Sequence, residues 1–574
     1  MNVKAIRTAC MNIHTRHIWI VSIVAAALIS CAHGIMSEAE PLEQDLYLCR
    51  GSFPAPRSQD QVRETVQKVT SELEAGTQPQ QIDILSPYDG AVFPRDIASP
   101  VFKWEHGPEG VTAWLILVSF EGSSHSVHVL TNTPEWTPQR EIWEIIKIQS
   151  LERQARVTVT GIHEGPGLAV LSKGLIHISI SKDGVESPVL YQHMPLPFAT
   201  GKQNPKLSVW RLAQVSSYEE PPVIMKNLPV CGNCHCISQK GTLFGMDMDI
   251  NGDKGAYTVA KIEEEMKLAQ DDFVSWNDFN RSDKIQSMGL FSRISPDDRY
   301  IVSTVKETSF FSMIPDINFS QFFFPIQGII AWYSFEEKQF HELPGADDPD
   351  YVQTCPEWSH DGRYVLFARA RTDKRLDDII GDRGYFNIEP GERIHDLNKK
   401  YQIQFDLYRV AFNKGKGGTP EPVIGASNNG MSNYFPRCSP DGRWIVFTRS
   451  PTGLAIQPES RLVIIPAEGG IPREMTCNLN IMNSWHSWSA NSRWLVFSSK
   501  EHSPFTGLFL THIDENGTDS PPVALSRFSS PSLACLAPEL VNIEPGAIKK
   551  ILLPEDTASW ERIKGPQNAD SNAR

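Results

Sequence analysis

The clearest chemical signal in this sequence is a segment of five residues. Cys231 and Cys234 stand three positions apart, and His235 follows directly. Two thiols at this spacing can each add to a vinyl group of one haem, and the histidine is then held against the iron. We therefore expect one covalent c-type haem, with Cys231 and Cys234 as its anchors and His235 as the proximal iron ligand. A disulfide or structural metal site that includes the adjacent Cys236 is the alternative.

A carboxylate-rich segment follows the haem motif. From Asp247 to Asp253 the residues read D-x-D-x-N-G-D, which matches the first half of an EF-hand calcium loop. In such a loop, alternating oxygen atoms converge on one cation. The twelfth position is Thr258, whereas the loop requires a glutamate there. A solvated turn is the favoured interpretation, and a calcium ion at this segment is the alternative.

Other chemical motifs are absent from the sequence. It has no glycine-rich phosphate loop, no H-E-x-x-H motif and no G-x-S-x-G nucleophile elbow. The formal net charge of −14 argues against a nucleic-acid partner, which needs a basic surface. We therefore expect an electron carrier or a binding protein rather than an enzyme.

The N-terminal residues predict export from the cytoplasm. Basic residues precede an apolar run from Ile18 to Ser30, which is about 13 residues long, whereas a membrane-spanning helix needs about 20. The run ends in the letters L-I-S-C, which resemble the lipobox of bacterial lipoproteins. Residues 1–31 are thus expected to be a lipoprotein-type signal peptide with lipidation at Cys31, and Ala32 favours the outer membrane over the inner. Ordinary signal cleavage, which leaves a soluble periplasmic protein, is the alternative.

The next two regions differ in texture. Residues 32–80 are interpreted as a tether that contains a short polar helix from Val62 to Ala75. Between residues 81 and 200, short runs rich in β-branched and aromatic residues alternate with Gly/Pro turns, as in 113–120 and 176–180. This pattern predicts a β-sandwich of the immunoglobulin or fibronectin type.

A repeated turn and strand organises the remainder of the chain. In each copy a serine opens a tight turn, and an apolar strand follows. We interpret the recurring Asp297, Asp361 and Asp441 as residues that the turn itself needs. Repeats of this length with several strands each are typical of propeller blades. The copies begin at Ser295, Ser359, Ser439 and Ser489, with a degenerate one at Ser238.

These copies resemble the repeats of TolB-type β-propellers, over roughly residues 205–550. The resemblance implies an all-β chain in which the sandwich is followed by a TolB-like propeller at 205–553 and a polar tail at 554–574. Five signatures are visible, and a further blade could combine residues 207–230 with strands from the C-terminus. Six blades are therefore expected, with five or seven left open.

Alignment of the copies places two histidines at one position. His235 and His486 both lie three residues before the serine of their repeat. The first and last of these blades are neighbours in a closed ring, so we expect both histidines to face the same space near the axis. His486 is therefore a candidate sixth iron ligand. Met246 and Met248 compete with it, because a thioether ligand raises the haem potential relative to two histidines.

Together these predictions describe an exported, lipid-anchored propeller that carries one c-type haem and transfers or senses electrons in the cell envelope. Its expected partners are an unidentified envelope or redox protein and, through the lipid on Cys31, the membrane. The order of signal, sandwich, haem motif and blades resembles that of TolB-like and cytochrome c-like envelope proteins. The alternative is a haem-free TolB-like platform for protein–protein interaction in the periplasm.

Overall fold

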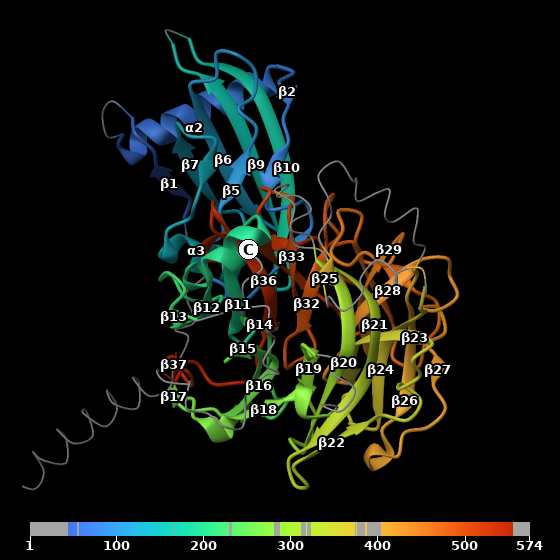
Figure 1. Cartoon of the computed structure of the whole chain (residues 1–574). Helices are drawn as coiled ribbons and strands as arrows, with labels where there is room; N and C mark the ends of the chain where they lie inside the picture. Colours follow the sequence, from blue (N-terminus) through green and yellow to red (C-terminus); the bar gives the residue numbers. More distant parts are fainter. Residues whose placement is uncertain are drawn as a thin grey trace, which may run out of the picture.

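The computed structural model describes residues 44–53, 57–165, 167–228, 232–279, 287–311, 317, 323–373, 375, 385–386 and 403–554. The expected signal peptide, the lipidation site Cys31, the haem anchor Cys231 and residues 555–574 of the expected tail lie outside this range. The described chain forms a β-sandwich followed by a propeller of four-stranded sheets (Figure 1). The predicted all-β fold class is therefore confirmed. No helix of the described residues is long and apolar enough to cross a membrane.

Two sheets build the sandwich. Their strands are β1 (Leu46–Cys49), β2 (Gln80–Gln81), β3 (Ile84–Ser86), β4 (Ala91–Pro94), β5 (Phe102–Trp104), β6 (Ala113–Phe120), β7 (Ser126–Thr131), β8 (Glu135–Trp136), β9 (Gln154–His163) and β10 (Ala169–Ser181). The larger sheet has the order β1-β7-β6-β9-β10-β2, with β4 also paired to β10, and the smaller sheet has the order β3-β5-β8. Alternation along β6 sends Trp114 and Ile116 into the inner core, whereas Ala113 and Leu115 face the opposite side.

The region expected as a tether is packed against this sandwich from Leu46 onward. Strand β1 pairs in parallel with β7, and α2 (Gln59–Glu74) covers the outer face of the larger sheet. The helix begins at a capping box with Ser58 as its N-cap. Val62 and Val69 lie two turns apart on one stripe and are fully buried. This apolar stripe needs a partner, which explains why the segment does not stand free.

A second helix, α3 (Arg140–Gln149), packs inside the sandwich, and the resulting core continues into the propeller. Trp143 of this helix is fully buried in the same cluster as Trp494, Leu508 and Phe528 of the propeller. A polar contact joins the two parts as well, because the Asn491 side chain donates to the Gly184 carbonyl oxygen at 2.8 Å. The two domains therefore share one core rather than meeting through a linker.

Six sheets of the described chain follow one another around an axis, each with four antiparallel strands in a row, and one of them has a fifth strand at its side. Blade 1 contains β11 (Val189–Pro195), β12 (Val209–Ala213), β13 (Val223–Met225) and β36 (Leu533–Leu540), and α4 (Phe198–Gln203) lies between β11 and β12. Blade 2 contains β14 (Gly232–Ile237), β15 (Leu243–Ile250), β16 (Asp253–Lys261) and β18 (Phe273–Ser275). Blade 3 contains β19 (Leu290–Ile294), β20 (Tyr300–Phe311), β21 (Phe323–Ser334) and β22 (Gln339–Glu342), and β25 (Tyr385–Phe386) also pairs with β20.

The remaining blades have the same order. Blade 4 contains β23 (Tyr351–Trp358), β24 (Tyr364–Arg371), β26 (Asp406–Ala411) and β27 (Glu421–Pro422). Blade 5 contains β28 (Ser432–Cys438), β29 (Trp444–Ser450), β30 (Arg461–Pro466) and β31 (Arg473–Glu474). Blade 6 contains β32 (Ser484–Trp488), β33 (Trp494–Ser499), β34 (Gly507–His512) and β35 (Val523–Ala524). A small parallel pair, β17 (Glu265–Lys267) with β37 (Lys550–Leu552), lies outside the blades.

Blade 1 joins the two ends of the propeller chain. Its innermost strand, β36, comes from the C-terminal part and pairs antiparallel with β11 (Figure 1). Strand β11 lies in the range that the sequence pattern assigns to the sandwich, yet it belongs to this sheet. The alternation of its side chains explains the ambiguity, because Val189 and Tyr191 pack into the core that the sandwich shares.

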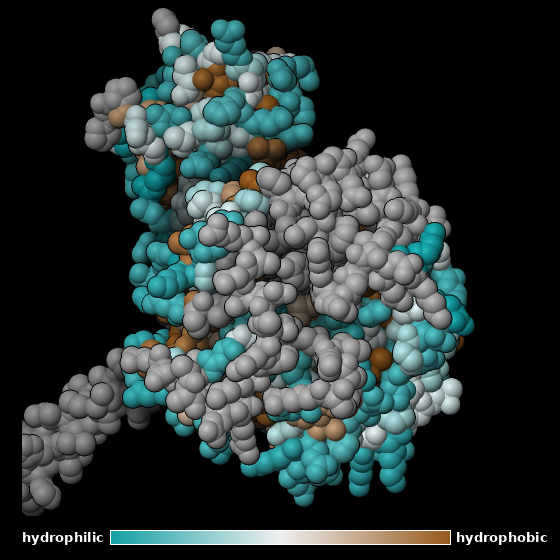
Figure 2. All heavy atoms as spheres, in the orientation of Figure 1, coloured by the Kyte–Doolittle hydropathy of each residue, from teal (hydrophilic) through white to brown (hydrophobic). Residues whose placement is uncertain are grey.

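The repeated turn is held by its own side chains. Ser295 donates to Asp297 Oδ1 at 2.6 Å and accepts from the backbone N–H of Tyr300 at 2.9 Å, and the other copies repeat this geometry. The structural role predicted for the recurring aspartates is therefore confirmed. On the face shown in Figure 2, the described surface is mostly hydrophilic, with hydrophobic residues scattered over it.

The copy in blade 6 has asparagine where the others have aspartate, and this exchange has a structural cause. Asn491 Oδ1 accepts from Ser489 as the aspartates do, while its Nδ2 supplies the bond to Gly184. Asn491→Asp should keep the turn but lose this donor, at a cost of about 1 kcal/mol, or roughly 1 °C in Tm for a cooperative unit of this size. Thermal unfolding followed by circular dichroism measures this loss. Asn516→Asp, in an exposed turn, is the matched control, and equal Tm values for the two variants would contradict the assignment.

Candidate functional site in the axial channel

The innermost strands share a β-bulge at one position. The pairing register shifts between Leu290 and Arg293 in β19 and between Ser484 and Ser487 in β32, and the inner strands of the other blades show the same shift. Bulges of this kind redirect the side chains next to them. The residues at the bulges have positive φ, from 45° to 63°: Phe291, Cys355, Phe435, Trp485 and Ala537.

These bulged residues meet on the axis and close one end of the channel. The ring centroids of Phe291 and Phe435 are 5.3 Å apart, and Phe435 stacks on Trp485 at 4.9 Å. The three rings come from blades 3, 5 and 6, so the contact of Phe291 with the other two crosses the axis. Cys234 and Cys355 pack against the same cluster. We call the following five residues the plug: Cys234, Phe291, Cys355, Phe435 and Trp485.

Two residues further along the inner strands, four charged side chains form a network across the channel. Arg293 Nη1 lies 3.0 Å from Glu539 Oε1, and Arg293 Nε lies 3.6 Å from Glu357 Oε2. Arg437 donates through Nη1 to the same Glu357 oxygen. We call these four residues the ion-pair ring. The equivalent positions in blades 2 and 6 are Cys236 and Ser487.

A cavity of about 150 Å³ lies on the side of the ion-pair ring away from the plug, and all six blades line it. Trp358 and Trp488 form part of its wall. Their indole N–H groups donate to the carbonyl oxygens of Arg293 and Arg437, both at 3.1 Å, which locks the two rings in place. His360, in the turn of blade 4, lies exposed at the rim. We call this cavity the channel mouth.

The carboxylates of the ion-pair ring are only weakly acidic. Burial raises the pKa of Glu357 and of Glu539 to about 7, although the neighbouring Arg293 acts in the opposite direction. Arginine side chains, in contrast, stay charged throughout the ordinary pH range. The ring thus combines two permanent cations with two carboxylates that exchange protons near neutral pH. Burial also raises the pKa of the nearby Cys236 thiol, to about 11.

The described residues of the haem motif, 232–235, lie in β14, the inner strand of blade 2. Cys234 belongs to the plug, whereas His235 points into the seam between blades 1 and 2, as expected for successive residues of a strand. His235 Nδ1 accepts from the Trp210 indole N–H at 3.2 Å, and Nε2 donates to the Leu190 carbonyl oxygen at 3.4 Å. Burial lowers the pKa of His235 to about 3, so its ring is neutral.

The two candidate methionine ligands lie near His235. Met246 is directly opposite it in the β14–β15 pair, and the methyl group of Met246 approaches Gly232 closely. Met246 and Met248 are both buried and pack in one apolar cluster with Trp210. The structure therefore brings a thioether beside the predicted proximal histidine, but on the same sheet face rather than across an open space.

The third candidate ligand, His486, lies elsewhere. Its Nε2 donates to the Val446 carbonyl oxygen in blade 5 at 3.0 Å. Ser292 has the same repeat position in blade 3 and donates to Asp247 of blade 2 at 2.6 Å. Side chains at this position thus face the preceding blade and not the axis. The structure does not bring His235 and His486 together, because each of them fills a different seam.

The described part of the motif does not fit a covalent haem in this arrangement. A thioether anchor and the axial ligand must approach one macrocycle, yet Cys234 and His235 point to opposite sides of β14. Both nitrogen atoms of His235 already have protein partners. Separately, the described residues include no group of three or more His, Cys, Asp or Glu side chains placed to hold a metal ion directly.

The carboxylate-rich segment forms a hairpin instead of a calcium loop. Strand β15 ends at Ile250 and β16 begins at Asp253, with Asn251 and Gly252 at positive φ in the turn between them. Asn-Gly is the preferred sequence for such a two-residue hairpin turn. The carboxylate of Asp253 accepts from Ser275 and Asn277, both at 2.6 Å. Its oxygens are therefore not directed to a common cation with those of Asp247.

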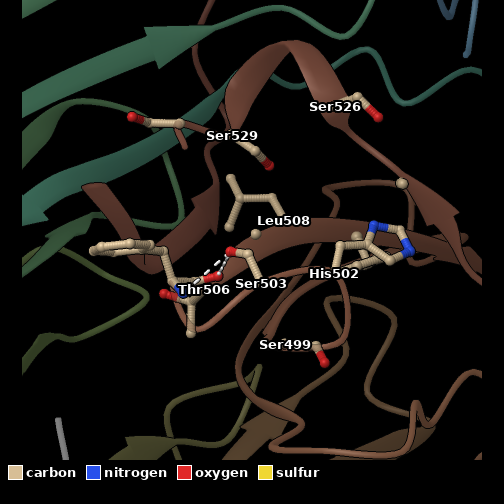
Figure 3. Close-up of a pocket in the computed structure, with 12 residues that line it drawn as sticks. Ser499, His502, Ser503, Thr506, Leu508, Ser526 and Ser529 are labelled. Carbon is tan, nitrogen blue, oxygen red and sulfur yellow. Dashed lines mark hydrogen bonds between the residues drawn. The ribbon is translucent and has the colours of Figure 1, made fainter. Parts of the chain in front are cut away.

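A second pocket, of about 110 Å³, lies at the outer part of blade 6 (Figure 3). Several hydroxyl groups line it, and Ser526 and Ser529 lie across from Ser499 in this view. The Ser499 hydroxyl donates to the Ile481 carbonyl oxygen, and Ser503 donates to that of Phe505. Because these hydroxyls serve the local backbone, the pocket offers a weaker site than the channel mouth.

No protein-family model and no curated protein matches the sequence. The similar solved structures include TolB-like β-propellers. TolB from Acinetobacter baumannii is 14% identical with a TM-score of 0.38, over 67% of this chain and 79% of that chain. TolB from Agrobacterium tumefaciens is 12% identical with a TM-score of 0.31, over 58% and 88%. Hydrazine synthase from Kuenenia stuttgartiensis is 11% identical with a TM-score of 0.26, over 49% and 76%. Likenesses at this level carry no statement about function.

The sequence analysis missed the ion-pair ring, although part of the signal is visible. The two histidines lie three residues before the serine of their repeat, whereas the charged residues lie two residues before it. Two residues upstream, three consecutive blades carry Arg293, Glu357 and Arg437, and charges are unusual on the inner strand of a propeller. Glu539 has no such signal, because β36 lacks the repeated turn.

The ion-pair ring should make stability fall as the pH rises. The pKa of Glu357 is about 7 in the folded chain against 4.5 in the reference state, so its contribution is complete below about pH 4.5 and lost as the pH rises through 7. We expect a Tm that decreases less from pH 5.0 to pH 7.5 in Glu357→Gln than in the unmodified chain, by about 2 °C or more.

The comparison between variants is needed because several buried histidines, among them His235 and His486, act in the opposite direction. Burial lowers the pKa of His235 to about 3 and that of His486 to about 4, so both favour stability as the pH rises toward 6.5. Their effect is common to all variants and cancels in the difference. Glu109→Gln, at an exposed position, is the matched control. A Glu357→Gln profile parallel to that of the unmodified chain would show that the ring carboxylate is not the titrating group.

Proposed function

We propose that this chain is an envelope protein that binds a protein partner at its channel mouth. One observation carries the proposal: residues from all six blades line a single cavity, and a buried network of two arginines and two glutamates lies at its base. Buried ion pairs contribute little net stability, and their best-attested value is in specificity. Placed in a cavity that opens outward, they supply directional contacts for a ligand.

The construction favours binding over catalysis. The plug closes the channel beyond the ion-pair ring, so a ligand enters and leaves at the mouth. The cavity of about 150 Å³ is smaller than pockets for small-molecule substrates, which usually measure about 300–1,000 Å³. A side chain or chain end fits this volume, while the body of a larger partner can rest on the surrounding turns.

The proposed location is the periplasm, with a lipid on Cys31 as the anchor. The support is the basic and apolar N-terminal segment and its L-I-S-C ending. Ala32 after the cysteine favours the outer membrane. In this arrangement the residues between Cys31 and the sandwich hold the propeller near the membrane surface.

Site-specific photo-crosslinking tests the binding proposal. A benzophenone side chain at His360, on the rim, should give a discrete adduct with another protein in the cells that naturally make this chain. The same group at Ile471, which is 90% exposed on blade 5, should not give that adduct. Identical adducts from both positions, or none from His360, would refute a partner at the channel mouth.

Electron transfer through a covalent haem is the second candidate, and the C-x-x-C-H spacing is the observation that favours it. Its chemistry would be one-electron exchange at the iron. The residues described in β14 pack without such a group. The two candidates differ in a property that can be measured directly, namely the presence of haem in the purified protein.

The packing of β14 predicts that folding does not require haem. Chain produced without the cytochrome c maturation machinery should have the same circular dichroism and Tm, within about 2 °C, as chain produced with it. The reason is that Cys234 and His235 already have protein partners. Pyridine haemochrome spectra of both preparations complete the measurement. A haemochrome band that disappears in Cys234→Ser but persists in Cys438→Ser would instead establish the haem and favour electron transfer.

A further inference from the structure

We propose that the channel mouth recognises a carboxylate group of the partner, with Arg437 as the residue that holds it. This inference rests on the proposed function, since it names the chemistry of the ligand at the same site. It follows from the unequal state of the two arginines, from the size of the cavity, and from the balance of charge around it.

The two arginines of the ion-pair ring are engaged to different degrees. Arg293 lies between two carboxylates, with Nη1 on Glu539 and Nε beside Glu357. The side chain of Arg437 has one acceptor among the described residues, which is Glu357. Its side chain is 21% exposed and lines the cavity, whereas that of Arg293 is 12% exposed. Arg437 therefore has guanidinium N–H groups left for a ligand.

A carboxylate is the group that suits these donors. The planar guanidinium presents its N–H groups as a fork, and a carboxylate accepts two of them in parallel. The cavity of about 150 Å³ accommodates a chain terminus or an acidic side chain but not a folded domain. The indole groups of Trp358 and Trp488 line the same space, and a charge-assisted hydrogen bond is stronger beside such low-dielectric walls than in water.

The charge of the mouth also favours an anion. The other titratable or charged side chains of the cavity lining are Arg293, Cys236, Cys438, His360 and the two ring glutamates. The arginines stay charged, whereas the pKa of each glutamate is raised to about 7 by burial. Burial also keeps both thiols neutral, because it raises their pKa values above the ordinary range. Near neutral pH the ring therefore has, on average, an excess of positive charge.

Because the charge of the ring depends on the protonation of its glutamates, the affinity for a carboxylate should depend on pH. When Glu357 takes up a proton, it releases its hold on Arg437 and no longer repels an incoming carboxylate. Glu539 adds positive charge to the ring in the same way. Carboxylate affinity should therefore rise as the pH falls from 8 to 6.

Titration calorimetry with three short peptides tests the inference. The probes are acetyl-Ala-Ala-Ala with a free C-terminus, acetyl-Ala-Glu-Ala-amide and, as the neutral reference, acetyl-Ala-Ala-Ala-amide. Binding of the first only identifies a chain terminus as the ligand, and binding of the second only identifies an acidic side chain. Either result, or binding of both, supports the proposal, provided that the neutral amide does not bind. Absence of binding by both carboxylates, or equal binding by the amide, would overturn it.

Variants of the full chain assign the contact to a residue. Arg437→Gln should weaken carboxylate binding at least tenfold, and Arg443→Gln, an exposed arginine of the same blade, should leave it unchanged. Arg437→Lys keeps the charge and guards against a folding defect, so it should retain more affinity than the glutamine variant. Glu357→Gln should bind more tightly at pH 8 and reduce the pH dependence. Unchanged affinity in Arg437→Gln would refute the assignment.

The photo-crosslink separates this inference from the function beneath it. If the adduct at His360 forms and both carboxylate peptides fail to bind, the partner uses the mouth through other chemistry, and only the carboxylate inference is lost. If the adduct does not form but the peptides bind as expected, the recognition chemistry stands, and the protein-partner proposal fails.

Discussion

The channel exists because two distant segments of the chain complete one sheet. Strand β36 supplies the inner edge of blade 1 and pairs with β11, more than 330 residues earlier in the sequence. Without this pairing the inner edges of blades 2 and 6 would be open, and Glu539 would not reach Arg293. The ion-pair ring, the plug and the cavity all depend on this one antiparallel contact. Closure of this kind also removes exposed strand edges, which are a hazard for β proteins.

The second constraint is the bulge that every inner strand repeats. At the bulge, the backbone takes a positive φ that costs conformational free energy. The bulge also arranges the side chains of the channel in layers, with aromatic rings and thiols in one layer and ion pairs in the next. The intervening residues, among them His235 and His486, point into the seams, where backbone carbonyl oxygens of the preceding blade accept their hydrogen bonds. Side chains at one repeat position thus point the same way in every blade, whichever residue type occupies the position. This regularity explains how residues 232–235, which belong to a motif with haem spacing, form an ordinary inner strand in this structure.

Much of the fold could be read from the sequence, because propeller turns are local. Ser295, Asp297 and Tyr300 define a blade turn within six residues, and the copies make the propeller visible. What could not be read depends on contacts between distant segments. The apolar stripe of α2 is weak in isolation, so its packing on the sandwich was hidden, and β11 has the same alternation whether it pairs in one domain or the other. At the site, Arg293, Glu357 and Arg437 were visible in the alignment, but their role emerges only when the ring brings Glu539 beside them. The direction of His486 was equally hidden, since it depends on the twist of each blade relative to its neighbour.

The shared core of the two domains has a mechanical consequence. The sandwich packs on residues from both blade 1 and blade 6, such as Tyr191, Leu540 and Trp494, and so it spans the joint where the ring is closed. Propellers that are fastened only by strand pairing can open at that joint under load. Here, separating β36 from its neighbours also requires the sandwich core to be broken. The N-terminal domain therefore stabilises the closed ring. A pull on the N-terminal end of the described chain would therefore be carried across the joint rather than separating the blades, and the geometry of the channel would persist under that load.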